Sequence, residues 1–87
     1  MLAQQGWKVK IRDRERNEPP HVTILHRTHA WRYGLRELEF LDREPPPREV
    51  PDEVIGAIHA QLDECRRAWD QMYPENPVGS QEDDHEQ

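Results

Sequence analysis

Two consecutive prolines, Pro19 and Pro20, precede a run of β-branched and aliphatic residues and limit where regular structure can begin. Each proline fixes its own φ, lacks a backbone N–H donor and pushes the residue before it toward extended geometry. Residues 22–25 are typical of a β-strand. The pattern therefore predicts a rigid turn that delivers His21 to the mouth of a strand, where its side chain can meet a partner.

Two other segments show the period-two pattern of half-buried strands. In residues 7–12 apolar and basic side chains alternate, which predicts a strand with a basic outer face. The strand of residues 21–27 follows, and a third strand begins near Ala30. The apolar phase then shifts by one residue after Gly34, which predicts a bulge or bend and allows a short fourth strand over residues 38–40.

An apolar stripe predicts one long helix over residues 52–73. Its members recur at spacings of 4, 4, 3, 4 and 3 residues, and they are Val54, Ile58, Leu62, Cys65, Trp69 and Met72. Such spacing places all of them on one helical face. Pro51 suits the first helical position, and Pro74 ends the helix.

These elements predict an α+β fold, with a three- or four-stranded antiparallel sheet packed on one face by the long C-terminal helix. A chain of 87 residues, 33% of them hydrophobic, has room for one small domain. We place this domain in residues 1–74 and expect Trp7, Trp31 and Trp69 to anchor its core. Residues 75–87 are acidic and lack periodicity, so we expect a disordered tail there.

Composition excludes several classes of protein. No apolar run approaches the roughly 20 residues that a membrane-spanning helix needs. The first residues lack the charged-then-apolar order of a signal peptide. The single cysteine, Cys65, excludes an internal disulfide framework, and its place in the apolar stripe favours packing over nucleophilic chemistry. We therefore expect a cytoplasmic protein that does not contact a membrane.

Five histidines raise the question of a metal site. On one strand, His21 and His26 project to opposite faces, so they cannot easily share one ion. His29 has the same parity as His21, but a turn separates them. His59 lies on the predicted helix and His85 in the tail. From the histidines we expect no metal and no cofactor.

Charge is divided unevenly along the chain, with a net +5 over residues 1–36 and −11 over residues 37–87. The candidate binding surface combines the basic outer face of the first strand, nearby arginines and the proline–histidine turn. Its residues are Pro19, Pro20, His21, Lys8, Lys10, Arg12, Arg27 and Arg32. Such a surface suits a protein partner or RNA phosphates. Because the acidic half repels a polyanion, we expect a protein, with RNA as the alternative.

Three groups of residues occur in order along the chain. They are Glu18-Pro19-Pro20-His21-Val22, then Leu38 and Phe40, then Leu62 and Trp69. Over about residues 6–74 this order resembles a small bacterial family of unknown function whose members carry E-P-P-H-[IV]-H-V after a first strand. The family continues with two strands and a C-terminal helix ending in a Leu…Trp pair, and it is similar to components of toxin–antitoxin-type gene pairs. The resemblance implies a small cytosolic protein with a cognate partner.

One position departs from the family pattern. The second histidine of the motif, two residues after His21, is replaced by Thr23. His21 alone can still donate or accept a hydrogen bond, or titrate near neutral pH. This chain therefore has only one of the two histidines of the motif. A reaction that needs both is not expected here, so the resemblance supports binding rather than catalysis.

We expect a protein-interaction module, one half of a toxin–antitoxin-like pair, whose partner is a small cognate protein. In this reading the chain has no catalytic residue. The alternative is a toxin that binds or cleaves RNA. His21 would then act as general acid or base, while Lys10, Arg12 and Arg27 bind phosphate.

Overall fold

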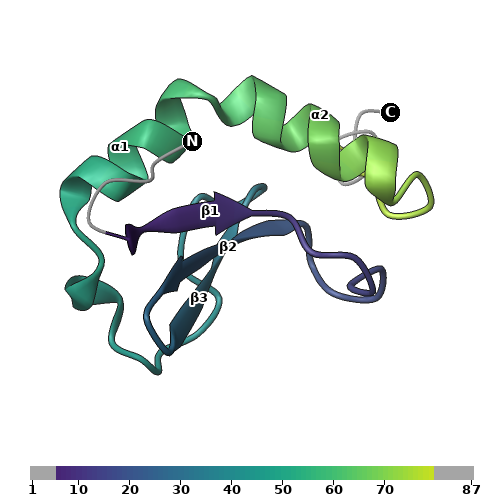
Figure 1. The fold of residues 1–87 in the computed structure, drawn as a ribbon. Helices are drawn as coiled ribbons and strands as arrows, with labels where there is room; N and C mark the ends of the chain where they lie inside the picture. The colour runs from purple at the N-terminus through teal and green to yellow at the C-terminus, as the bar shows by residue number, and fades with distance from the viewer. Residues whose placement is uncertain (1–5, 80–87) are drawn as a thin grey trace.

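In the computed structural model, which describes residues 6–79, a three-stranded sheet is followed by two helices (Figure 1). The strands are β1 (Lys8–Lys10), β2 (His21–His26) and β3 (His29–Gly34), and the helices are α1 (Asp52–Ala60) and α2 (Leu62–Met72). A 3-10 turn, η2 (Pro47–Glu49), leads into α1. The sheet is antiparallel in the order β1-β2-β3, so the expected α+β class is confirmed.

The register of the sheet sorts its side chains onto two faces. Val9, Ile24 and Trp31 are cross-strand partners and therefore lie side by side on one face. Val22 and Tyr33 are partners on the same face, and both are buried. This apolar face is the one that the alternation in the sequence predicts.

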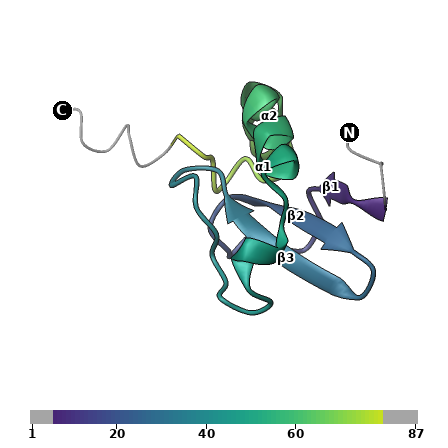
Figure 2. The ribbon, with the colours of Figure 1, turned by 90° about the vertical axis from the view of Figure 1, so that its left-hand side faces the viewer.

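The helices lie together on one side of the sheet (Figure 2). α1 buries Val54 and Ile58, and α2 buries Cys65 and Trp69. These four members of the predicted stripe join the buried strand residues in one hydrophobic core. Met72 also belongs to the stripe but is 44% exposed, because α2 ends at this residue.

The prediction of one long helix over residues 52–73 is wrong. The helix breaks at Gln61, which has φ −117° and ψ 27° and whose N–H donates to the carbonyls of both Ala57 and Ile58. An unbroken helix of this length would be roughly 30 Å long, whereas the six residues of β2 span about 20 Å. The break lets the chain bend over the sheet, so both helices contribute to one core (Figure 1). Within the described part of the chain, no helix combines the length and apolar character needed to cross a bilayer.

The chain turns after Gly34, where the shift in apolar phase predicts a bend. The Gly34 N–H donates to the Glu39 carbonyl at 2.9 Å, and a Cβ at this position would collide with the side chain of Glu37. Phe40 then pairs with Tyr33 in an isolated bridge. The short fourth strand is therefore reduced to one bridge at the edge of β3.

The folded part extends past the expected end of the domain. Val78 is buried, and the Trp69 indole N–H donates to the Asn76 carbonyl oxygen at 2.8 Å. Residues 75–79 therefore pack on the domain instead of starting a tail. The rest of the expected tail, residues 80–87, lies outside the described residues.

Replacing Ile58 tests the core that joins the helices to the sheet. Ile58 is fully buried, so Ile58→Ala should lower the free energy of unfolding by about 2–5 kcal/mol through lost burial and a residual cavity. Met72→Ala is the control and should change it by less than about 1 kcal/mol. Urea unfolding followed by tryptophan fluorescence measures both values. Equal effects of the two substitutions would contradict this core.

Candidate functional site

The loop between β1 and β2, residues 11–20, reaches the C-terminal end of α2 (Figure 1). Side chains beyond that end hold the loop in place. The Glu15 backbone N–H donates to the Tyr73 hydroxyl at 2.9 Å, and Asn76 Nδ2 donates to the Glu18 carbonyl at 2.8 Å. Both glutamates are thus positioned by groups 58 residues away in the sequence.

His21, the first residue of β2, is 0% exposed. The Trp69 ring packs against it with the ring centroids 5.4 Å apart. Its Nδ1 lies 2.8 Å from the Pro19 carbonyl oxygen, and because a carbonyl only accepts, Nδ1 carries the proton of this hydrogen bond. Pro20 is buried as well, while Pro19 is exposed. His21 does begin a strand after the proline turn, but its side chain is enclosed by the protein and does not reach the surface.

The second ring nitrogen of His21 faces two carboxylates of the loop, and we call Glu15, Glu18 and His21 the His21 cluster. Nε2 lies 3.2 Å from Glu15 Oε1 and 3.7 Å from Glu18 Oε1. Within residues 6–79, neither Nε2 nor Glu15 Oε1 has a hydrogen-bond partner, although both atoms are buried. The Glu15 side chain is 12% exposed and that of Glu18 39%. The cluster therefore meets solvent on the Glu18 side.

Arg32 on β3 connects the His21 cluster to the segment after β3. Its guanidinium donates two hydrogen bonds to Asp42, at 2.9 and 2.6 Å, and one to Glu18 Oε1 at 3.0 Å. These hydrogen bonds hold the pKa of the Asp42 carboxyl below its usual value, against the opposing effect of partial burial, and the Arg32 charge adds to the lowering. The hydrogen bonds to Asp42 raise the pKa of Arg32 further. Arg32 is thus ion-paired within the protein and is not a free phosphate ligand.

Thr23 stands where the resembled family has its second histidine. It is the cross-strand partner of Arg32 and shares a sheet face with His21, as residues two apart on a strand must. Thr23 is buried, and its hydroxyl oxygen has no hydrogen-bond partner among the described residues. The face that would carry two histidines is therefore buried at both positions.

The predicted basic residues do not form one patch. Lys8 and Lys10 are exposed and alternate with Val9, so they lie on the sheet face away from the helices. Arg12 lies beyond the end of β1, because the strand stops after three residues. Arg27 lies in the turn between β2 and β3, at the opposite end of the β1–β2 pair. With Arg32 ion-paired, the exposed basic stretch consists of Lys8, Lys10 and Arg12.

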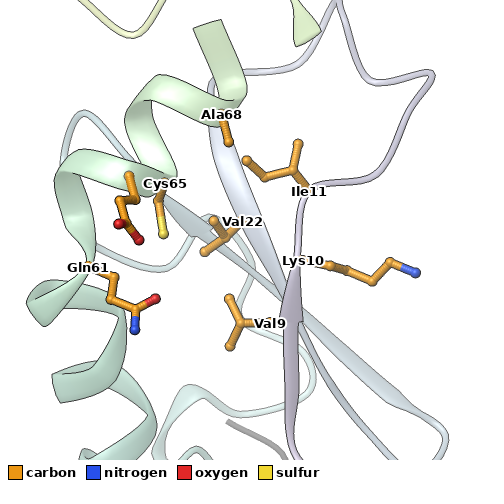
Figure 3. Close-up of a pocket in the computed structure, with 8 residues that line it drawn as sticks. Val9, Lys10, Ile11, Val22, Gln61, Cys65 and Ala68 are labelled. Carbon is orange, nitrogen blue, oxygen red and sulfur yellow. The ribbon is translucent and has the colours of Figure 1, made fainter. Parts of the chain in front are cut away.

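A groove of about 210 Å³ lies between β1 and α2 (Figure 3). Residues that line it are Val9, Ile11, Val22, Glu64, Cys65 and Ala68. Burial raises the pKa of the Cys65 thiol, and the charge of Glu64 acts in the same direction. Cys65 therefore lines the groove and does not act as a thiolate nucleophile. Lys10 also borders the groove, but the end of its side chain points to the other side of β1 (Figure 3).

Sequence patterns indicate His21 but not its acidic neighbours. Glu18 lies within the proline motif and Glu15 three residues before it, so a search for carboxylates near each histidine would have found both. Asp42 gives no such signal, because its partner Arg32 is ten residues away across a bend. The groove leaves no signal in the sequence either, since β1 and α2 meet only in the folded chain.

Comparisons with known proteins assign no family to the chain. No family model, curated protein or solved structure matches it. The resemblance to the E-P-P-H-[IV]-H-V family therefore stays a prediction, and function has to be inferred from the surfaces of the molecule.

The pair between Arg32 and Asp42 predicts a pH-dependent contribution to stability. Because folding lowers the pKa of Asp42, the contribution is complete above the usual carboxyl pKa of about 4 and is lost as the pH falls through the lower folded value. Asp42→Asn should cost about 1 kcal/mol at pH 7, allowing for the partial exposure of both side chains, and almost nothing near pH 2.

Thermal unfolding of both proteins across this pH range measures the difference. Asp13→Asn is the control, because Asp13 is exposed in the loop after β1. A cost of Asp42→Asn that does not change between neutral and acid pH would contradict the assigned pair.

Proposed function

We propose that the chain is a protein-interaction module of the cytoplasm that binds an extended segment of a small cognate protein along the free edge of β1. The observation that carries the proposal is the position of this edge beside the apolar groove. One half of a toxin–antitoxin-like pair is the setting that the sequence resemblance suggests.

β1 is an edge strand. It pairs with β2 on one side, and in the described residues no strand pairs with its other side. The backbone N–H and C=O groups along such an edge are a template for another strand, and many peptide-binding domains use this mode of recognition. The groove between β1 and α2 lies next to this edge and offers space for side chains of an added strand (Figure 3).

The two faces of β1 define the chemistry of the partner. Side chains of an added strand would alternate between the groove, near Val9 and Ile11, and the opposite face, near Lys8 and Lys10. Apolar side chains suit the first environment and acidic side chains the second, because opposite charges on neighbouring strands attract. The expected partner segment therefore alternates apolar and acidic residues.

RNA has less support as a ligand. The alternative requires His21 to contact the nucleic acid together with Lys10, Arg12 and Arg27. His21 is enclosed by protein, and Arg27 lies at the opposite end of the β1–β2 pair from Arg12. Lys8 and Lys10 remain available to phosphate, and the tests below distinguish the two ligands.

A peptide in which valine and glutamate alternate tests the edge directly. It should shift the amide NMR signals of residues 8–11 and 61–68, which border the groove. A matched peptide in which lysine replaces glutamate should bind about tenfold more weakly or worse, because its charges would lie against Lys8 and Lys10. Equal affinities, or shifts confined to other surfaces, would contradict the proposal.

Charge reversal tests the same surface with the natural partner. Lys8→Glu combined with Lys10→Glu should reduce the protein retained from nuclease-treated host extract by about tenfold or more. Arg43→Glu combined with Arg48→Glu is the control, since both arginines are exposed on a different part of the molecule. The retained protein should also be displaced by the valine–glutamate peptide. Retention unaffected by reversal at Lys8 and Lys10 would contradict the proposal, and material lost on nuclease treatment would favour RNA.

A further inference from the structure

The His21 cluster brings three metal-ligating side chains together below the surface. One nitrogen of His21 and one oxygen each of Glu15 and Glu18 all lie within 4.8 Å of one another. His21 is 0% exposed, and its Nε2 atom is directed into the cluster without a hydrogen-bond partner in residues 6–79. A buried nitrogen in this state needs a partner, because an unsatisfied buried polar atom costs about 1–3 kcal/mol.

The hydrogen bond on the other side of the ring determines what that partner can be. Since Nδ1 donates to the Pro19 carbonyl, Nε2 of a neutral His21 carries a lone pair. This lone pair faces the carboxylate oxygen of Glu15, which also only accepts. Two such acceptors repel unless a proton or a metal cation lies between them. A ring N–H bonded to a backbone carbonyl is also the usual arrangement behind a metal-bound histidine, where it fixes the ring and its tautomer.

The distances suit a small divalent ion. Bonds of about 2.0–2.2 Å to nitrogen and oxygen place the ligand atoms of a tetrahedral zinc ion roughly 3.3–3.5 Å apart. Nε2 lies 3.2 Å from Glu15 Oε1 and 3.7 Å from Glu18 Oε1. To reach this geometry, the partly exposed Glu18 side chain would have to move toward His21 and share its Oε1 atom between the ion and Arg32.

Charge around the cluster also favours a cation. Glu15, Glu18 and Asp42 are acidic, and the basic Arg32 donates hydrogen bonds to Asp42 and Glu18. Arg32 forms a two-pronged hydrogen bond with Asp42 and a single hydrogen bond with Glu18 Oε1, so these two carboxylates share its one positive charge. Three carboxylates and one guanidinium leave two formal negative charges beside the His21 ring, and a divalent ion balances them.

We propose that Glu15, Glu18 and His21 bind a divalent transition-metal ion, with Zn²⁺ as the expected occupant. One imidazole and two carboxylates are ligands that Zn²⁺ accepts, and three protein ligands leave its fourth position for water. The ion ties the loop of residues 11–20 to the first residue of β2. The ligands of this site are not residues of the β1 edge, so its test does not depend on the proposed partner.

Metal titration tests the site. Chelator-treated protein should bind one Zn²⁺ at the cluster by calorimetry, with a rise in melting temperature, because binding to the folded state alone stabilises it. Co²⁺, used as a spectroscopic substitute, should give visible absorption bands. In ¹⁵N NMR the Nε2 signal of His21 should shift while Nδ1 keeps its proton.

Glu15→Gln and Glu18→Gln should each weaken Zn²⁺ binding at least about tenfold, by removing a charged ligand. Both substitutions keep the size of the side chain, so we expect the variants to fold. Weaker Zn²⁺ binding can then be assigned to the lost carboxylate. Glu44→Gln and His29→Gln are the controls, because both residues are exposed outside the cluster. They should leave cluster binding unchanged.

Three outcomes would overturn the proposal. One is folded protein that binds no Zn²⁺. Another is binding that Glu15→Gln and Glu18→Gln leave unchanged, which would place the ion elsewhere. The third is a His21 ring that holds protons on both nitrogens at pH 7 with or without Zn²⁺, which would make the cluster a buried ion pair.

Discussion

Trp69 is the residue on which the rest of the structure depends. It is completely buried in α2, its ring packs against His21 and Tyr73 with centroid separations of 5.4 and 4.3 Å, and its indole N–H donates to the Asn76 carbonyl. One side chain therefore joins the helix, the first residue of β2 and the turn after α2. Together with Trp7 and Trp31, which are also buried, it supplies much of the apolar area of the core.

The loop of residues 11–20 takes its conformation from the groups that Trp69 holds. The Tyr73 hydroxyl donates to the Arg12 carbonyl, and Asn76 donates to the carbonyls of Arg16 and Glu18. These bonds fix the backbone on which the acidic side chains of the His21 cluster stand. The cluster is therefore a product of tertiary packing, even though its three members lie within seven residues of one another.

The sequence predicts those parts of the fold that depend on local patterns. Alternation of apolar and polar residues locates the strands, and the stripe from Val54 to Trp69 identifies the buried face of the helices, because both patterns reflect burial on one side of an element. Gln61 shows the limit of this reasoning. The stripe continues through it without interruption, so the spacing of the apolar residues does not record the break that the structure has there.

In the candidate site, too, some features can be predicted from the sequence and others depend on tertiary contacts. The two prolines place His21 at the start of β2, as the restricted backbone requires. The prolines do not predict the burial of His21, because the groups that cover it, Trp69 and Glu15, lie on a distant helix and in a loop. Charge counting likewise marks Arg32 as a surface cation, whereas its neutralisation by Asp42 depends on the bend after β3.

The β1 edge and the His21 cluster are linked through one stretch of backbone. β1 ends at Lys10, and the loop that carries Glu15 begins at Ile11, which lines the groove. An ion bound to the cluster would add a further link to a loop that hydrogen bonds to Tyr73 and Asn76 already hold, and so would help to keep Ile11 in place before a partner arrives. Docking against an ordered groove loses less conformational entropy than docking against a mobile one. The two proposals are independent in their chemistry, but in a domain this small each site would strengthen the other through the shared loop.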